Sequence, residues 1–173
     1  MSRWTLRAAC DADLAFLFSV YASTRQDELA CTGWDAAQTL AFLRSQFELQ
    51  HNQYHRQFPQ ASYDVVWLDD QPVGRLYVDR SAQAIHVLDI ALLLPYRQRG
   101  GGSMLLQAIL AEAAAQGLPV ELFVERNNPA AAWYRKLGFV LIDDSHGLYH
   151  EMRWQSFGLA ESELLRSQAC ATA

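Results

Sequence analysis

The pattern of hydrophobic and polar residues predicts a chain in which strands and helices alternate. Strict alternation and short apolar runs mark the strands, whereas apolar residues at helical spacing mark the helices. Expected strands cover residues 3–9, 62–68, 73–79, 84–94, 120–124, 139–144 and 148–154. Expected helices cover residues 13–23, 35–58, 102–116, 128–137 and, at the surface, 156–173. Residues 24–34 indicate a loop or a broken helix.

Residues that begin or end helices support these boundaries. Asp11 or Asp13 can cap the first helix, and Asp35 can cap the second. Gly117 and Gly138 suit positions just past the ends of two later helices. The resulting order, β-α-α-β-β-β-α-β-α-β-β, predicts an α/β fold of the mixed α+β kind.

Composition favours one compact enzyme-sized domain over residues 1–173. The chain has 173 residues, of which 51% are hydrophobic, so a sizeable core can form. The formal net charge of -5 argues against nucleic acid as a partner, since phosphate binding requires a basic face. The first residues lack the apolar core of a signal peptide, and no apolar run is long enough to span a bilayer. We therefore expect a cytoplasmic protein without a membrane partner.

The cysteines and histidines do not predict a metal site. The cysteines, Cys10, Cys31 and Cys170, are widely spaced and odd in number. They form no CxxC pair and no Cys/His cluster at metal-ligand spacing. We expect neither a disulfide framework nor a bound metal.

Three consecutive glycines, Gly100 to Gly102, stand between an apolar strand and a helix. A helix start exposes unpaired N–H groups and the positive end of the helix dipole. Glycine lets an anion approach these groups, so the stretch predicts a phosphate-binding nest. Arg97 and Arg99 add positive charge at its rim, and Ser103 adds a hydroxyl. The alternative is a flexible turn without a ligand.

Two other phosphate motifs do not fit this stretch. A P-loop needs Lys followed by Ser or Thr after its glycines, and neither is present. The dinucleotide fingerprint needs a third glycine where Leu105 stands.

Two segments together resemble the signature of the GNAT (Gcn5-related N-acetyltransferase) superfamily. The first is DIALLLPYRQRGGGSMLL, in which Arg97 to Gly102 fit the core pattern Arg/Gln-x-x-Gly-x-Gly/Ala. The second is ELFVERNNPAAAWYRKLGF, a strand followed by Asn, Ala and a helix with Tyr and Leu-Gly-Phe. The resemblance covers about residues 85–154. Its proline lies one place later than usual, at Pro95.

The resemblance implies a central, twisted, mostly antiparallel sheet flanked by helices, and acetyl-CoA as the acyl donor. In this family the strand before the loop contacts the pantetheine arm, and the loop amides hold the pyrophosphate. Gly101 occupies the free position of the pattern, without a family reason for glycine. The cofactor-binding residues carried over are Leu92, Leu93, Leu94, Arg97, Gln98, Arg99, Gly100, Gly101, Gly102, Ser103, Asn128, Ala131 and Tyr134.

Tyr134 matches the family tyrosine that donates a proton to the leaving CoA thiolate. A phenol with an ordinary pKa of about 10 suits that role. Asn128 matches the family asparagine near the pantetheine, although it can equally be a helix cap. A backbone N–H near Leu92 is expected to polarise the thioester carbonyl. Tyr134 and Asn128 can alternatively be a core aromatic and a cap alone.

The general base stays open between His86, Asp89, Glu125, Glu28 and a water relay. The family's acceptor site is usually framed by the first two helices and the late hairpin. Candidate lining residues are Arg25, Glu28, Trp34, Gln50 and Tyr54, each of which can instead belong to a solvated helix face.

The sequence therefore predicts an acetyl-CoA-dependent N-acetyltransferase that acts on a primary amine of a small molecule or peptide. No cysteine lies near the two motifs, which favours direct transfer in a ternary complex. The alternatives are another acyl-CoA donor and a CoA-binding regulatory module without catalysis. Small members of the family are often dimers, so a homodimer is among the expected assemblies.

Overall fold

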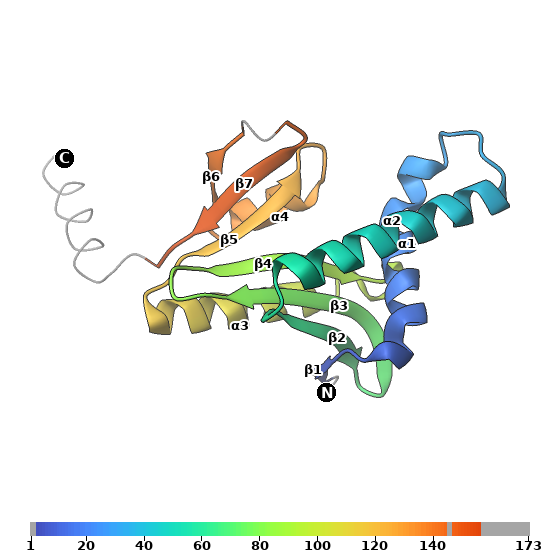
Figure 1. The fold of residues 1–173 in the computed structure, drawn as a ribbon. Helices are drawn as coiled ribbons and strands as arrows, with labels where there is room; N and C mark the ends of the chain where they lie inside the picture. The colour runs from blue at the N-terminus through green and yellow to red at the C-terminus, as the bar shows by residue number, and fades with distance from the viewer. Residues whose placement is uncertain (1–2, 145–146, 157–173) are drawn as a thin grey trace, which may run out of the picture. The chain divides into compact units, whose positions relative to one another are not determined.

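The computed structural model describes residues 3–144 and 147–156, and most of the predicted C-terminal helix lies outside this range. The elements follow the predicted order (Figure 1). The strands are β1 (Trp4–Ala8), β2 (Ser62–Leu68), β3 (Gln71–Arg80), β4 (Ile85–Leu92), β5 (Val120–Glu125), β6 (Val140–Asp143) and β7 (Tyr149–Trp154). The helices are α1 (Leu14–Leu29), α2 (Ala36–Gln57), α3 (Gly101–Gln116) and α4 (Ala130–Lys136), with short 3-10 turns η1 (Asp11–Asp13) and η2 (Leu94–Tyr96). The predicted mixed α/β class is confirmed.

The described chain divides into two compact units. The first contains residues 3–81 and 86–107, and the second contains residues 82–85 and the described part of 108–156. In the first unit the strands lie in the order β1-β2-β3-β4. The β1–β2 and β2–β3 pairs are antiparallel, with Leu6 opposite Val66 and Val65 opposite Arg75.

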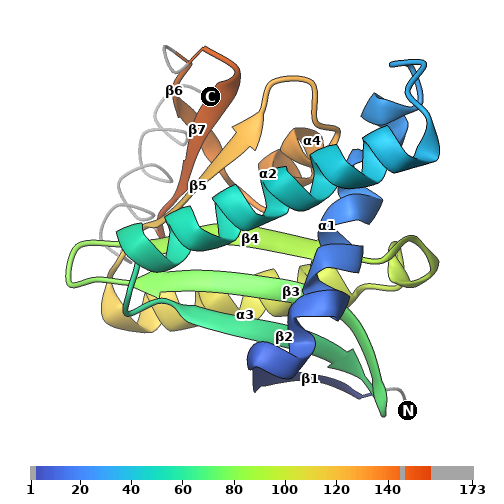
Figure 2. The same cartoon turned by 45° about the vertical axis from the view of Figure 1, so that its right-hand side comes forward.

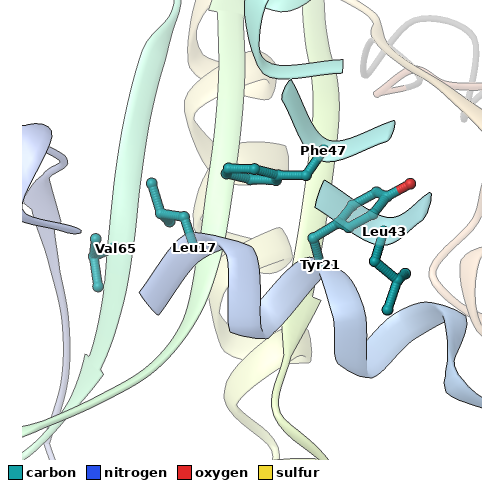
Figure 3. Packing of buried hydrophobic residues seen from close by; sticks show 5 residues of the cluster. All are labelled: Leu17, Tyr21, Leu43, Phe47 and Val65. Carbon is teal, nitrogen blue, oxygen red and sulfur yellow. The ribbon is translucent and has the colours of Figure 1, made fainter. Parts of the chain in front are cut away.

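Helices α1 and α2 cover one face of these strands, as both views show (Figure 2). Their apolar stripes meet in a cluster with β2, in which the rings of Tyr21 and Phe47 lie 5.8 Å apart (Figure 3). The cluster consists of Leu17, Tyr21, Leu43, Phe47 and Val65. Leu17 and Tyr21 on α1, and Leu43 and Phe47 on α2, are four residues apart, the spacing that places side chains on one face of a helix.

The helix boundaries agree with the sequence at α2 and differ at α1. Asp35 caps α2 as predicted, because its carboxylate accepts from the N–H of Gln38 at 2.8 Å. The prediction of a loop or broken helix from residue 24 onward was wrong for its first part, since α1 continues to Leu29. Thr24 is compatible with the helix because its hydroxyl donates to the Tyr21 carbonyl one turn earlier, at 2.7 Å.

The second unit contains three antiparallel strands in the order β5-β7-β6, together with α4. Leu122 of β5 and Met152 of β7 are paired and buried. Gly138 follows α4 with φ +95, a conformation that glycine adopts without strain, so it ends the helix as predicted. Arg153 and Glu121 form an ion pair of 2.6 Å across the β5–β7 ladder.

Candidate active site

The predicted phosphate nest lies at the junction of β4 and α3, within the first unit. Strand β4 ends at Leu92, two residues before the end of the expected strand, because the chain turns into η2. The N–H of Leu93 still donates to the carbonyl of Val73 on β3, at 2.9 Å, which fixes the start of the turn. The N–H of Met104 donates to the carbonyl of Gly100 at 2.9 Å, in the i→i−4 pattern of a helix. The backbone N–H groups before Met104 therefore come before the i→i−4 hydrogen bonds of α3 and have no acceptor within the helix.

The backbone of the loop is left-handed at two positions, Gln98 with φ 59 and Gly100 with φ +83. A Cβ atom on Gly100 would meet nothing within 4 Å, so glycine is needed there for its backbone conformation and not for space. Gln98, Arg99 and Gly100 are exposed. Left-handed residues in a turn orient successive amides toward one concave surface, which is the geometry of an anion nest. The loop thus has the backbone conformation of an anion-binding nest.

Gly101 has a different requirement, which the sequence did not reveal. A Cβ atom on this helical residue would lie 2.6 Å from Cζ2 of Trp4 in β1. The indole ring leaves no room for any side chain at this position. The glycine at the free position of the motif therefore lets the start of α3 pack against β1.

We expect Gly101→Ala to destabilise the protein by about 1–3 kcal/mol, because an overpacked contact forces the ring and helix apart. Urea unfolding measures the change, and Trp4→Leu should remove most of it in the double variant. Equal destabilisation by Gly101→Ala in the presence and absence of the indole would contradict the contact.

The two arginines of the motif have different surroundings. Arg97 is half-buried, and its Nε donates to the carbonyl of Leu92 at 2.7 Å. The guanidinium of Arg99 is exposed and lies 5.5 Å from the centroid of the Tyr96 ring. Arg97 therefore holds the end of β4, whereas Arg99 is the better placed of the two to attract an anion at the surface.

Three predicted site residues belong to the second unit. The side-chain oxygen of Asn128 accepts from the N–H of Ala130 at 2.9 Å, so Asn128 caps the turn into α4. Ala131 and Tyr134 are buried, with 6% and 7% of their surfaces exposed. The Tyr134 ring packs edge-on against Phe139, with centroids 5.6 Å apart. These contacts fix the side chain of Tyr134 within its unit.

The match to a known family covers the part of the chain that contains the predicted cofactor-binding residues. The sequence profile of the acetyltransferase (GNAT) family matches residues 25–139. The chain belongs to the GNAT acetyltransferase family. Members of this family use acetyl-CoA as acyl donor, so the predicted donor is confirmed at the level of the family. No curated protein matches the sequence significantly.

Solved GNAT structures share the fold at low sequence identity. PaiA N-acetyltransferase from Thermoplasma acidophilum, in complex with coenzyme A, has a TM-score of 0.67 and 17% identity, over 89% of this chain and 99% of its own. The ribosomal-protein-S18-alanine N-acetyltransferase from Escherichia coli has a TM-score of 0.57 and 17% identity, over 91% and 97%. Arabidopsis thaliana Naa50, bound to a bisubstrate analogue CoA-Ac-MVNAL, has a TM-score of 0.53 and 19% identity, over 89% and 99%. At these identities the likeness shows the GNAT fold.

The residues proposed for the acceptor site of this GNAT protein do not form one group. Arg25 and Glu28 form an ion pair of 3.2 Å on α1. Trp34 lines an open groove of about 600 Å³ in the first unit, together with residues of α1, the α1–α2 loop and α2. Gln50 and Tyr54 lie on α2 and contact β3 and β4 instead. The groove is lined by Phe18, Ser19, Ala22, Ser23, Gln26, Leu29, Ala30, Gly33, Trp34, Thr39 and Leu43.

The residue that sequence reasoning missed is Arg75. It is 2% exposed and is the buried charged residue of the described ranges 3–144 and 147–156. Its guanidinium forms an ion pair of 2.6 Å with Asp89, one of the candidate bases. Burial is the largest single influence and lowers the pKa of Arg75, but the Asp89 carboxylate, together with Tyr77 and Tyr54, raises the pKa of the guanidinium above its ordinary value. The sequence did contain a signal for this residue, because Arg75 stands among the apolar residues of an expected strand, where a charged side chain needs a buried partner.

Two further observations on the described residues concern metal ions and membranes. No group of three or more His, Cys, Asp or Glu residues within 3–144 and 147–156 is arranged to hold a metal ion. No described helix is long and apolar enough to cross a membrane.

Proposed function

We propose that the protein is an N-acetyltransferase that acetylates a primary amine of a small molecule or peptide by direct transfer in a ternary complex. The observation that carries the proposal is the β4–α3 junction, where the exposed, left-handed residues Gln98 and Gly100 precede the start of α3. Such a junction binds phosphate groups through its amides. Acetyl-CoA supplies an activated acetyl thioester.

The chain's own residues have distinct roles in this proposal. The amides from Gln98 to Ser103 hold the pyrophosphate, and Arg99 attracts it. The end of β4, which Arg97 secures at Leu92, aligns the pantetheine arm and the acyl carbonyl. Tyr134 gives its phenolic proton to the departing sulfur, a general-acid role. The other binding residues carried over from the family, Leu93, Leu94, Asn128 and Ala131, complete the cofactor contacts.

Two of the similar structures bear on the class of acceptor. The Naa50 structure contains a peptide analogue, and the Escherichia coli enzyme is named for a protein alanine, which favours a peptide amine as one class to test. The exposed Cys10 and Cys31 lie outside the two motif segments, so direct transfer remains our preferred route. The cytoplasmic location, the homodimer and the absence of nucleic-acid and membrane partners remain predictions from the sequence.

Ligand binding and thiol release test the proposed function. CoA and acetyl-CoA should raise the melting temperature by mass action, whereas adenosine should not. A panel of spermidine, kanamycin, free amino acids and an alanine-initiated peptide is then assayed for release of the CoA thiol. CoA binding without thiol release for any amine would favour the regulatory module, and no binding of CoA would exclude both functions.

A further inference from the structure

One guanidinium, that of Arg75, joins helices α1 and α2 to the strands of the first unit. Arg75 projects from β3, and its Nη2 donates to Asp89 Oδ2 of β4 at 2.6 Å and to Gln50 Oε1 of α2 at 3.1 Å. The same group lies over the rings of Tyr77 and Tyr21, with centroid distances of 5.2 and 5.7 Å. Arg75 is therefore the common contact of α1, α2, β3 and β4.

The arrangement is poorly explained by stability alone. Removing two charges from water costs several kcal/mol per ion, and a buried ion pair often gives no net gain over apolar residues of similar volume. Arg75 Nε is also buried without a hydrogen-bond partner in the described structure, which adds a desolvation cost. Neighbours such as Val73, Val87 and Tyr77 are buried and apolar or aromatic, so this face can accept an apolar pair.

Strand β4, which Arg75 contacts through Asp89, leads to the candidate site. Beside Asp89, the carbonyl of Leu88 accepts from the Tyr54 hydroxyl of α2 at 3.1 Å. The neighbour of Arg75, Gly74, lies so close to β4 that a Cβ atom would stand 2.6 Å from Leu92 Cδ2. Strand β4 is thus anchored at Leu88 and Asp89 and packed tightly at Leu92, where the acyl group is expected to be aligned.

We propose that Arg75 is a positioning residue that, through Asp89 and Gln50, fixes the course of β4 up to Leu92 for acetyl transfer. This role rests on the proposed function. It does not require Asp89 to touch the substrate, and it assigns the Asp89 carboxylate to holding the strand. The loop amides that bind the pyrophosphate lie beyond Leu92, so CoA binding should depend little on the ion pair.

The test replaces the whole pair, because a single Arg75→Met change leaves Asp89 without its partner and can unfold the protein. In Arg75→Met/Asp89→Leu we expect a melting temperature equal to or above that of the wild type. We expect kcat for thiol release, measured with the fastest amine of the panel above, to fall on the order of 100-fold, as misplaced reacting groups do. The dissociation constant of CoA, measured by calorimetry, should change less than about threefold, because the amides that bind the pyrophosphate are not altered.

Two variants distinguish positioning by Arg75 from base catalysis by Asp89 and from the general loss of an ion pair. Asp89→Asn keeps an acceptor oxygen for Arg75, so it should retain most of kcat, and its pH–rate profile should keep the wild-type shape. Arg153→Met/Glu121→Leu removes the partly buried pair of 2.6 Å in the second unit and should leave kcat unchanged.

The outcomes distinguish this role from the proposed function. Undiminished kcat in Arg75→Met/Asp89→Leu would overturn the positioning role and leave the acetyltransferase intact. Loss of kcat in Asp89→Asn as large as in the double variant, with loss of the acid limb of the profile, would make Asp89 the base and also overturn it. No thiol release by the wild type with any amine would remove the proposed function, and the positioning role with it.

Discussion

Valine in place of Gly100 should weaken CoA binding at least about tenfold. The residue has φ +83, and a β-branched side chain in the left-handed region costs about 1–2 kcal/mol or more, which the chain avoids by rebuilding the loop. A rebuilt loop no longer directs its amides at one point, so the pyrophosphate loses several hydrogen bonds together. Calorimetric titration with CoA, well below the melting temperature of the variant, measures the loss.

Two further variants show that conformation and position cause the effect. Asparagine tolerates the left-handed region, and the space around Gly100 is open, so Gly100→Asn should keep most of the affinity. Gly117 also has a positive φ, of +66, and open space around it, but it follows the other end of α3. Gly117→Val should therefore lower the melting temperature and leave CoA affinity unchanged. Equal CoA affinities of the wild type and Gly100→Val would show that the conformation of this loop does not contribute to CoA binding.

The role of Gly100 could be predicted from the sequence, whereas the role of Gly101 could not. At Gly100 local sequence was sufficient, because a glycine between a strand and a helix indicates a left-handed turn and backbone amides that can bind an anion. The requirement at Gly101 depends on Trp4, which comes beside it only when the chain has folded. Motif positions that look free can thus be constrained by distant packing.

Arg75 and Arg97 illustrate the same limit for charged residues. Arginine near a glycine loop is expected to face a phosphate, yet Arg97 turns back to the carbonyl of Leu92. Arg75 lies on an apolar strand, and only the arrangement of α2 beside β3 and β4 brings Gln50 and Asp89 to it. Hydrophobic periodicity predicted the elements, but a polar contact between elements depends on register and side-chain direction, which periodicity does not specify.

The continuation of α1 past residue 24 has a similar cause. The stretch Thr24–Leu29 contains polar residues that interrupt the apolar stripe, so its pattern indicated a loop. In the structure Arg25 and Glu28 pair across one turn of the helix at 3.2 Å. Such pairs stabilise a helix without any apolar periodicity.

Removing one hydroxyl, in Tyr134→Phe, should lower kcat for acetyl transfer by about 100-fold or more, the usual contribution of a positioned general acid. The ring is buried and packs against Phe139 and Trp133 through its faces and edges, so phenylalanine should keep the packing. Affinity for CoA should change little, because the loss concerns the departure of the thiolate and not ground-state binding. Thiol release under saturating acetyl-CoA and a fixed amine measures kcat, and calorimetry measures affinity.

A second tyrosine provides the matched control. The Tyr63 hydroxyl donates to the carbonyl of Phe58 at 3.0 Å within the first unit, and Tyr63→Phe removes that bond as well as one hydroxyl. This variant should lose about 1 kcal/mol of stability, a typical net value for one hydrogen bond, and keep its turnover. If Tyr134→Phe turns over as fast as Tyr63→Phe, the proton that reaches the thiolate comes from water, and Tyr134 is a packing residue of α4. A selective loss in Tyr134→Phe, with CoA affinity and melting temperature preserved, would favour the phenol as the donor, because the two variants differ in where the hydroxyl is lost and not in its chemistry.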